Sequence, residues 1–151
     1  MRIMAVDYGD ARTGVAVSDE LATLAGEAWV IHEKNQKALV RAVADEVASR
    51  GIGRIVVGYP RNMDGTAGSR AVKCEQFAES LRAELSGLQP NGEMSGLQRS
   101  AEVVLWDERL TTMSAHRILS DTGKYGKKRK ESVDAVAASL ILEGYLRYLN
   151  K

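Results

Sequence analysis

The stretch Met1-Arg-Ile-Met-Ala-Val-Asp7 runs directly into Tyr8-Gly-Asp-Ala-Arg-Thr-Gly14-Val-Ala-Val-Ser18. Two runs of β-forming residues flank a glycine-containing turn, a pattern that predicts a hairpin. Asp7 ends the first strand, so its carboxylate has a buried scaffold behind it and solvent in front. Such a carboxylate suits a divalent cation, but an aspartate that hydrogen-bonds its own turn backbone explains this stretch equally well.

The composition is that of a single globular domain. The chain has 151 residues, 44% of them hydrophobic and 27% charged, which argues against disorder and for one domain over residues 1–151. Its one cysteine, Cys74, excludes an intrachain disulfide and favours a reducing, cytoplasmic setting. The N-terminus does not have the pattern of a signal peptide, and no apolar run reaches the roughly 18 residues of a membrane span. We therefore expect a soluble protein without a membrane partner.

Hydrophobic periodicity predicts an α/β fold. Five β-type runs are expected to be strands: Arg2–Asp7, Thr13–Ser18, Leu24–Ile31, Arg54–Tyr59 and Glu102–Trp106. Four segments are expected to be helices: Asn35–Arg50, Thr66–Ser86, Thr111–Ser120 and Glu131–Asn150. The aperiodic segment Gly87–Ser100 is expected to be a long loop. The order βββ-α-β-α-β-α-α predicts a mixed five-stranded sheet, an antiparallel meander plus parallel strands, with helices on both faces.

Three acidic residues stand where structure alone does not require them. Asp7 ends the first strand, Glu108 follows the fifth, and Asp134 lies among alanines in the first turn of the last expected helix. A favourable helix dipole would also explain Asp134. If the first and fifth strands lie near each other and run parallel, Asp7 and Glu108 emerge at the same edge of the sheet, and the small alanines let the last helix bring Asp134 to it.

Converging carboxylates repel one another unless a cation lies between them. Mg²⁺ or Mn²⁺ fits such a set of oxygen ligands, and two ions about 4 Å apart would suit hydrolysis of a phosphodiester. The sequence offers no other catalytic or metal-binding motif of comparable strength. The two histidines, His32 and His116, are isolated, and the chain has neither a P-loop nor a nucleophile elbow.

Two basic features are candidates for contacts to phosphate. The segment Lys124-Tyr-Gly-Lys127-Lys128-Arg129-Lys130 places five cations in an expected loop. Arg70 lies near the start of the second expected helix, which Thr66 is placed to cap. A solvated loop and an ordinary strand-to-helix connection are the structural alternatives, and both stay open on spacing alone.

Four segments, in this order, resemble the YqgF/RuvX family over nearly the whole chain. They are Asp7-Tyr-Gly-Asp-Ala-Arg-Thr-Gly14-Val-Ala, Gly58-Tyr-Pro-Arg-Asn-Met-Asp-Gly65-Thr, Asp107-Glu-Arg-Leu-Thr-Thr112 and Lys128-Arg-Lys-Glu-Ser-Val-Asp134-Ala-Val-Ala-Ala138. The resemblance implies an RNase H-like fold and a cytoplasmic nuclease that matures the 5′ end of 16S rRNA from its precursor. It also implies that Asp7, Glu108 and Asp134 are metal-binding catalytic carboxylates. Supporting positions are implied at Arg12, Asn62, Asp64 and Arg109. Tyr59 and Arg61 stand beside Pro60 where the family usually has aliphatic residues.

Two other functions stay open on the sequence. The family resemblance also admits a Holliday junction resolvase, and a non-catalytic transcription-associated factor of the same fold is a third possibility. An actin-like kinase is disfavoured because 151 residues cannot form its two lobes. Structured RNA and branched DNA both present phosphates to a basic rim, so the substrate, a ribosomal precursor particle as partner, and the oligomeric state are not decided by the sequence.

Overall fold

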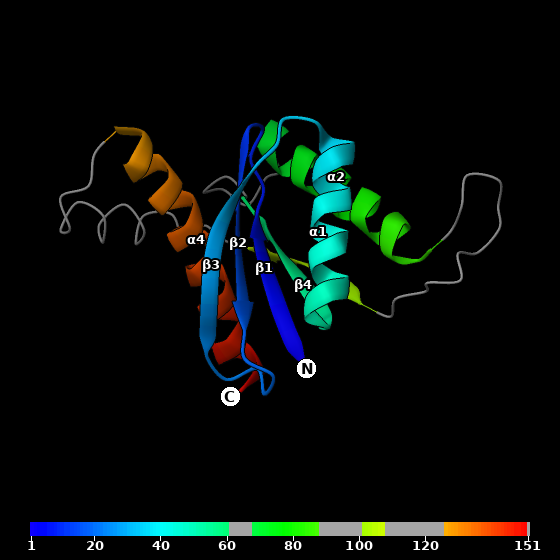
Figure 1. Ribbon diagram of the computed structural model, residues 1–151, viewed down its shortest axis with the longest axis vertical. Helices are drawn as coiled ribbons and strands as arrows, with labels where there is room; N and C mark the ends of the chain where they lie inside the picture. Colours follow the sequence, from blue (N-terminus) through cyan, green and yellow to red (C-terminus); the bar gives the residue numbers. More distant parts are fainter. Residues whose placement is uncertain (61–67, 88–100, 108–125, 151) are drawn as a thin grey trace.

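A computed structural model of the chain describes residues 1–60, 68–87, 101–107 and 126–150, with the backbone alone at 126–132 (Figure 1). One sheet of five strands, in the order β3-β2-β1-β4-β5, forms its centre. The strands are β1 (Arg2–Asp7), β2 (Arg12–Ser18), β3 (Ala25–His32), β4 (Ile52–Tyr59) and β5 (Glu102–Asp107). The helices are α1 (Gln36–Arg50), α2 (Ser69–Leu85) and α4 (Gly126–Leu149).

The sheet has the mixed topology that the sequence predicts. β1, β2 and β3 form an antiparallel meander, whereas β4 pairs parallel with β1 and β5 pairs parallel with β4. The crossover through α1 begins where the Asn35 side chain accepts a hydrogen bond from the Ala38 amide, 3.0 Å away. It ends at Gly51, whose φ of 65° is the left-handed conformation that glycine adopts freely. Each predicted strand agrees with an observed one to within two residues at either end.

Helices cover both faces of the sheet and enclose two hydrophobic cores. Met4 and Val6 of β1 pack in the core beneath α1 and α2, whereas Ile3 and Ala5 pack in the core beneath α4. Since side chains alternate along a strand, Asp7 continues the series that faces α4. The predicted stripe of α2, which includes Cys74 and Phe77, is buried as expected, so Cys74 is a packing residue.

The start of α4 differs from the prediction. The helix begins at Gly126, so the backbone of Lys127, Lys128, Arg129 and Lys130 is helical, and the prediction of a basic loop there is wrong. Lysine and arginine are good helix formers, and one glycine does not outweigh them. Asp134 consequently lies in the interior of α4, beyond its first turn, and the favourable interaction with the helix terminus does not explain its presence.

The buried stripe of α4 is also only partly the predicted one. Ala137 and Ile141 are buried as expected, but Val133, Val136 and Leu140 are only partly buried. The other buried positions are Ala138, Leu142, Tyr145 and Leu146. The buried stripe of the helix therefore runs from the small Ala137 and Ala138 to the large Tyr145 and Leu146.

Several expectations lie outside the described residues. These are the helix over Thr111–Ser120, the loop over most of Gly87–Ser100, and the cap at Thr66; α2 itself starts at Ser69, after Gly68. Among the described helices, none is long and apolar enough to cross a membrane.

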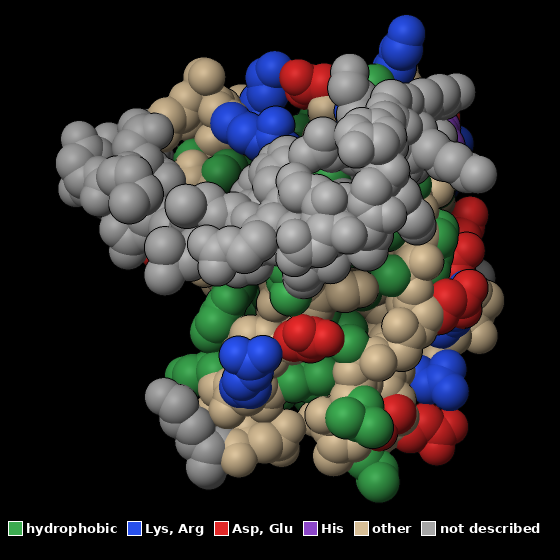
Figure 2. All heavy atoms as spheres, turned by 90° about the vertical axis from the view of Figure 1, so that its left-hand side faces the viewer, with side chains coloured by type: hydrophobic (Ala, Val, Ile, Leu, Met, Phe, Trp, Pro, Cys, Tyr) green, Lys and Arg blue, Asp and Glu red, His purple; other side chains and the backbone are tan. Residues whose placement is uncertain are grey.

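The end of the molecule away from Asp7 carries exposed apolar side chains. Leu21 and Leu24, near the β2–β3 turn, are 80% and 71% exposed. Leu24 lines an open hollow of about 570 Å³ together with Leu146 and Arg147 of α4. Figure 2 shows hydrophobic side chains gathered over the lower part of the face that carries α4 and β3.

Candidate active site

The parallel strands end together at one edge of the sheet. Val6 of β1 is paired with Val57 of β4, and Tyr59 of β4 is paired with Asp107 of β5. Asp7 and Asp107 therefore end β1 and β5 at the same edge, on either side of β4. Glu108 follows Asp107 directly in the sequence but lies outside the described residues, so its approach to Asp7 stays a prediction.

A close backbone contact brings α4 to this edge. Asp7 is paired with Gly14 of β2, and a Cβ atom built on Gly14 would lie 2.0 Å from the backbone oxygen of Asp134. No side chain fits at Gly14, so the helix rests directly on the strand next to Asp7. The structure thus brings Asp7 and Asp134 together, as the sequence analysis expects from the alanines around Asp134. Gly14 itself is a structural requirement that the sequence analysis missed.

The electrostatics of Asp7 reflect this crowded position. The pKa of Asp7 is raised from its usual 3.8 to about 6, because burial, the largest cause, and the Asp134 carboxylate raise it by more than the Arg70 guanidinium lowers it. Arg12 reaches from β2 to Asp134, with 3.2 Å between its Nε and Oδ2. Both side chains of that pair are partly buried, so the contact is screened less than a surface ion pair. The edge therefore holds two neighbouring carboxylates and two guanidinium groups.

The donor chemistry fits a hard divalent cation. Carboxylate oxygens are the ligands that Mg²⁺ and Mn²⁺ prefer, and a cation between Asp7 and Asp134 would offset both the burial and the repulsion that raise the pKa of Asp7. Within the described part of the chain, no group of three or more potential ligand side chains is assembled. The described residues include two of the predicted ligands, Asp7 and Asp134, whereas the third, Glu108, lies outside them.

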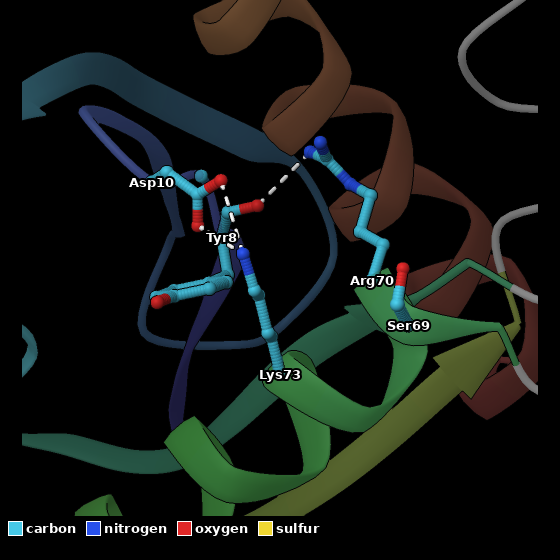
Figure 3. A pocket seen from close by; sticks show the side chains of 6 residues that line it. Tyr8, Asp10, Ser69, Arg70 and Lys73 are labelled. Carbon is cyan, nitrogen blue, oxygen red and sulfur yellow. Dashed lines mark hydrogen bonds and ion pairs between the residues drawn. The ribbon is translucent and has the colours of Figure 1, made fainter.

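The basic side of the edge comes from α2. The Arg70 Nη2 donates a hydrogen bond to the backbone oxygen of Tyr8, 3.1 Å away, which places its guanidinium beside the residue that follows Asp7. One turn further along, Lys73 Nζ lies 3.3 Å from Asp10 Oδ1 in the β1–β2 turn. Both cations line a cavity of about 170 Å³ between the turn and the helix (Figure 3). The sequence analysis named Arg70 but missed Lys73, whose only signal is its place one helical turn after Arg70.

The remaining predicted residues are placed only in part. Lys127–Lys130 occupy the turns of α4 that precede Asp134. Asn62, Asp64 and Arg109 lie outside the described residues. His32 is exposed at the end of β3, and His116 lies outside the described part. The structure thus joins Asp7, Asp134, Arg12 and Arg70 and leaves the other predicted contacts untested.

Comparison with known proteins gives the family. The family model for RuvX, described as Holliday junction resolvase, matches residues 1–148. This chain belongs to the RuvX family. A relative from Halothermothrix orenii, named "Putative pre-16S rRNA nuclease", is 40% identical over 151 residues, covering 100% of this chain and 98% of its own. A second, from Bacillus cytotoxicus and with the same name, is 41% identical over 148 residues, covering 97% and 98% of the two chains.

Solved structures agree on the fold of this RuvX-family chain. The fowlpox virus resolvase in complex with Holliday junction DNA matches with a TM-score of 0.57 and 14% identity over 100% of both chains. The RuvC protein of T. thermophilus in complex with a Holliday junction matches with a TM-score of 0.56 and 15% identity over 98% of this chain and 96% of its own. At such low identity these matches establish the fold alone, and the expected RNase H-like architecture is confirmed.

Proposed function

We propose that this RuvX-family protein is a divalent-metal-dependent endonuclease that hydrolyses phosphodiester bonds in structured nucleic acid. The observation that carries the proposal is the forced proximity of Asp7 and Asp134 across Gly14. Two carboxylates held together at the end of parallel strands, with guanidinium groups beside them, suit a cation and a phosphate together. Membership in a family described as a resolvase, and relatives named as nucleases, support the same reaction.

The proposed cofactor is Mg²⁺ or Mn²⁺, as two ions, held by Asp7, Asp134 and Glu108. When bound, such ions lower the pKa of a coordinated water and stabilise charge on the leaving oxygen. The protein's own contribution is to hold the carboxylates in place through the strand and helix backbones. Arg70 and Arg12 lie beside the two carboxylates, where the substrate phosphate would bind, and both attract and orient that phosphate.

The favoured substrate is the 5′ end of precursor 16S rRNA, with a ribosomal precursor particle in the cytoplasm as the setting. The support is the name carried by relatives at 40% and 41% identity over almost the whole chain. A four-way DNA junction is the second candidate, favoured by the family description and by the fold shared with two junction-bound resolvases. A non-catalytic nucleic-acid-binding factor is disfavoured because such a protein would not need both carboxylates at the sheet edge.

Cleavage of two substrates by matched variants tests the proposal. Purified protein is incubated with precursor 16S rRNA and with a four-way DNA junction, each with Mg²⁺, Mn²⁺ or EDTA. We expect metal-dependent cutting that Asp7→Asn and Asp134→Asn each abolish, whereas Asp45→Asn, on the exposed side of α1, retains it. Full activity in a folded Asp7→Asn protein, or equal cutting in EDTA, would overturn the assignment of the site. Preference for one substrate decides between RNA and branched DNA.

A further inference from the structure

The cavity between the β1–β2 turn and α2 lies outside the pair of carboxylates. It measures about 170 Å³ and is lined by Tyr8, Gly9, Asp10, Ser69, Arg70 and Lys73. Since a water molecule takes about 30 Å³ in the liquid, the cavity has room for a phosphate group with part of its hydration. Figure 3 shows the Arg70 and Lys73 side chains extending from α2 toward the turn, with Asp10 and the Tyr8 carbonyl opposite them.

The walls of this cavity are held in place before any ligand arrives. The Tyr8 ring stacks on Phe77 of α2 with 5.1 Å between ring centroids, which fixes the turn to the helix. At Gly9 a Cβ atom would lie 2.1 Å from the backbone oxygen of Arg12, so the turn is closed as tightly as glycine allows. The Thr13 hydroxyl donates to the Gly9 carbonyl and accepts from the Gly9 amide, at 3.4 and 3.3 Å. A cavity with fixed walls binds its ligand with less loss of entropy than a flexible loop does.

The polar groups in the cavity favour an anion. Arg70 uses one Nη2 hydrogen bond on the Tyr8 carbonyl, and a guanidinium carries five N–H donors in all. Lys73 contacts Asp10 with its Nζ at 3.3 and 3.4 Å from the two carboxylate oxygens. The side chains of Lys73 and Asp10 are 51% and 72% exposed, and such surface pairs stabilise a protein by about 1 kcal/mol at most. A phosphate oxygen can therefore replace Asp10 as the partner of Lys73 at little cost.

The position of the cavity indicates which phosphate it would take. Its lining begins at Tyr8, the residue that follows Asp7, and Arg70 lies close enough to Asp7 to attract its carboxylate. If the scissile phosphate of a nucleic-acid strand lies at Asp7, a neighbouring phosphate of the same strand would lie at the cavity. We propose that this cavity binds a backbone phosphate next to the scissile one, with Arg70 and Lys73 as its ligands and Asp10 as the anion that it displaces. This inference rests on the proposed function, and it adds Lys73 and Asp10 as residues that position the substrate.

Binding measurements on intact RNA test this inference apart from catalysis. A fluorescent RNA that contains the 5′ cleavage region of precursor 16S rRNA is titrated in EDTA, across a range of salt concentrations. Lys73→Ala should weaken binding at least fivefold and lower the slope of log K against log[salt] by about 0.7 to 0.9, the effect of one lost phosphate contact. The matched control is Lys37→Ala, an equally exposed lysine on α1, which should stay within twofold of the wild type.

The companion variant Asp10→Asn has the opposite expected effect. Removal of the carboxylate that competes for Lys73 should tighten RNA binding two- to fivefold. If Lys73→Ala behaves like Lys37→Ala, or if Asp10→Asn weakens binding, the cavity is not a phosphate site. Both positions are exposed, so thermal unfolding should be close to that of the wild type and should confirm that the variants are folded.

Neutral linkages in the probe identify the phosphate itself. In a set of 2′-O-methyl RNA probes, each phosphate around the cleavage position is replaced in turn by an uncharged methylphosphonate. At one position next to the scissile linkage, the replacement should weaken the wild type at least as much as Lys73→Ala does, and it should weaken that variant less than the wild type, because only the Arg70 contact is left to lose. If every replacement weakens both proteins equally, Lys73 contacts no single phosphate and the inference fails.

Two further outcomes separate the possible sources of failure. Inorganic phosphate should compete with RNA only at tens of millimolar, and displacement at micromolar concentrations would point to a small phosphate compound and overturn the nucleic-acid assignment. The Lys73 effect should persist in Asp7→Asn, because binding does not require cleavage. A protein that shows the Lys73 effect but cuts no substrate contradicts the proposed nuclease function alone. A protein that cuts without this effect contradicts the cavity assignment alone.

Discussion

Replacing Asp7 by asparagine should stabilise the metal-free protein at neutral pH. Burial beside Asp134 raises the pKa of Asp7 from 3.8 to about 6, so ionisation of this carboxyl is less favourable in the folded chain than in the unfolded one. By linkage, that difference corresponds to about 3 kcal/mol of lost stability at pH 7 and above, as an upper bound. Asparagine has nearly the same shape and carries no charge, so Asp7→Asn should recover most of this free energy.

The stability of the wild type is expected to fall as the pH rises. Between about pH 4 and pH 6 the folded state binds the extra proton, so the wild type should lose stability as the pH rises through this window. Below pH 4 both states are protonated at Asp7, and the two proteins should have similar free energies of unfolding. The difference between them should therefore grow from near zero at pH 4 to its full value above pH 6.

Urea denaturation in EDTA at pH 4, 5, 6 and 8 measures this difference directly. Asp45→Asn, on the exposed side of α1, is the control and should differ from the wild type by less than about 0.5 kcal/mol at every pH. A constant difference between Asp7→Asn and the wild type across this range would refute the reasoning, as would a less stable Asp7→Asn protein at pH 8. Adding Mg²⁺ or Mn²⁺ should stabilise the wild type more than Asp7→Asn, because the variant has lost a ligand.

Three further predictions concern packing, binding and chemistry. Gly14→Ala should destabilise the protein by about 2 kcal/mol or more in urea denaturation, because its Cβ meets the Asp134 backbone; unchanged stability would contradict the direct contact of α4 with β2. Replacing residues 127–130 by alanine should weaken RNA binding with little dependence on the RNA sequence and should reduce the salt dependence of binding. If fluorescence titrations give an unchanged slope of log K against log[salt], these four residues do not contact the RNA backbone. Cleavage with Mg²⁺ should leave 5′-phosphate and 3′-hydroxyl ends, and 2′,3′-cyclic phosphates detected by mass spectrometry would exclude attack by water.

Periodicity predicted the sheet well because the strands have strong local signals. The runs that became β1 and β4 are rich in β-branched and apolar residues and are bounded by glycine or proline. The stripe of α2 was predicted correctly for a similar reason, since its apolar residues recur at helical spacing and face one core. These features depend on residues close together in the chain, and a single sequence contains them.

The start and rotation of α4 could not be read in the same way. Lys127–Lys130 have no apolar period, so the segment resembled a loop although its residues form helices readily. Gly14, more than a hundred residues away, lets the backbone of α4 at Asp134 lie directly on β2, and this contact helps to set which side of the helix is buried. That contact depends on the packing of two distant elements and has no signal within either segment.

Only part of the candidate site could be predicted, because some of its contacts also join segments that are distant in the sequence. Asp7 at the end of a strand and Asp134 among alanines in the last helix were recognisable as candidates in the sequence. The Arg12–Asp134 and Lys73–Asp10 pairs, in contrast, join residues that only the folded chain brings together. Arg12 and Arg70 were named from family resemblance and from phosphate chemistry, respectively. Lys73 had neither signal, because its role becomes apparent only from the cavity that it lines.

The contact at Gly14 keeps Asp7 and Asp134 close together at this edge of the sheet. A backbone packed on a backbone cannot be moved aside as a flexible side chain can, so the main chains of Asp7 and Asp134 stay close whether or not their carboxyl groups are ionised. Arg12 pairs with Asp134, and Arg70 lowers the pKa of Asp7, yet burial and the Asp134 carboxylate keep that pKa raised to about 6. The protein's own cations therefore compensate the site only in part. Ordinary packing would favour a neutral residue at Asp7, and a carboxyl with a perturbed pKa is typical of functional sites, which supports the proposed cation site.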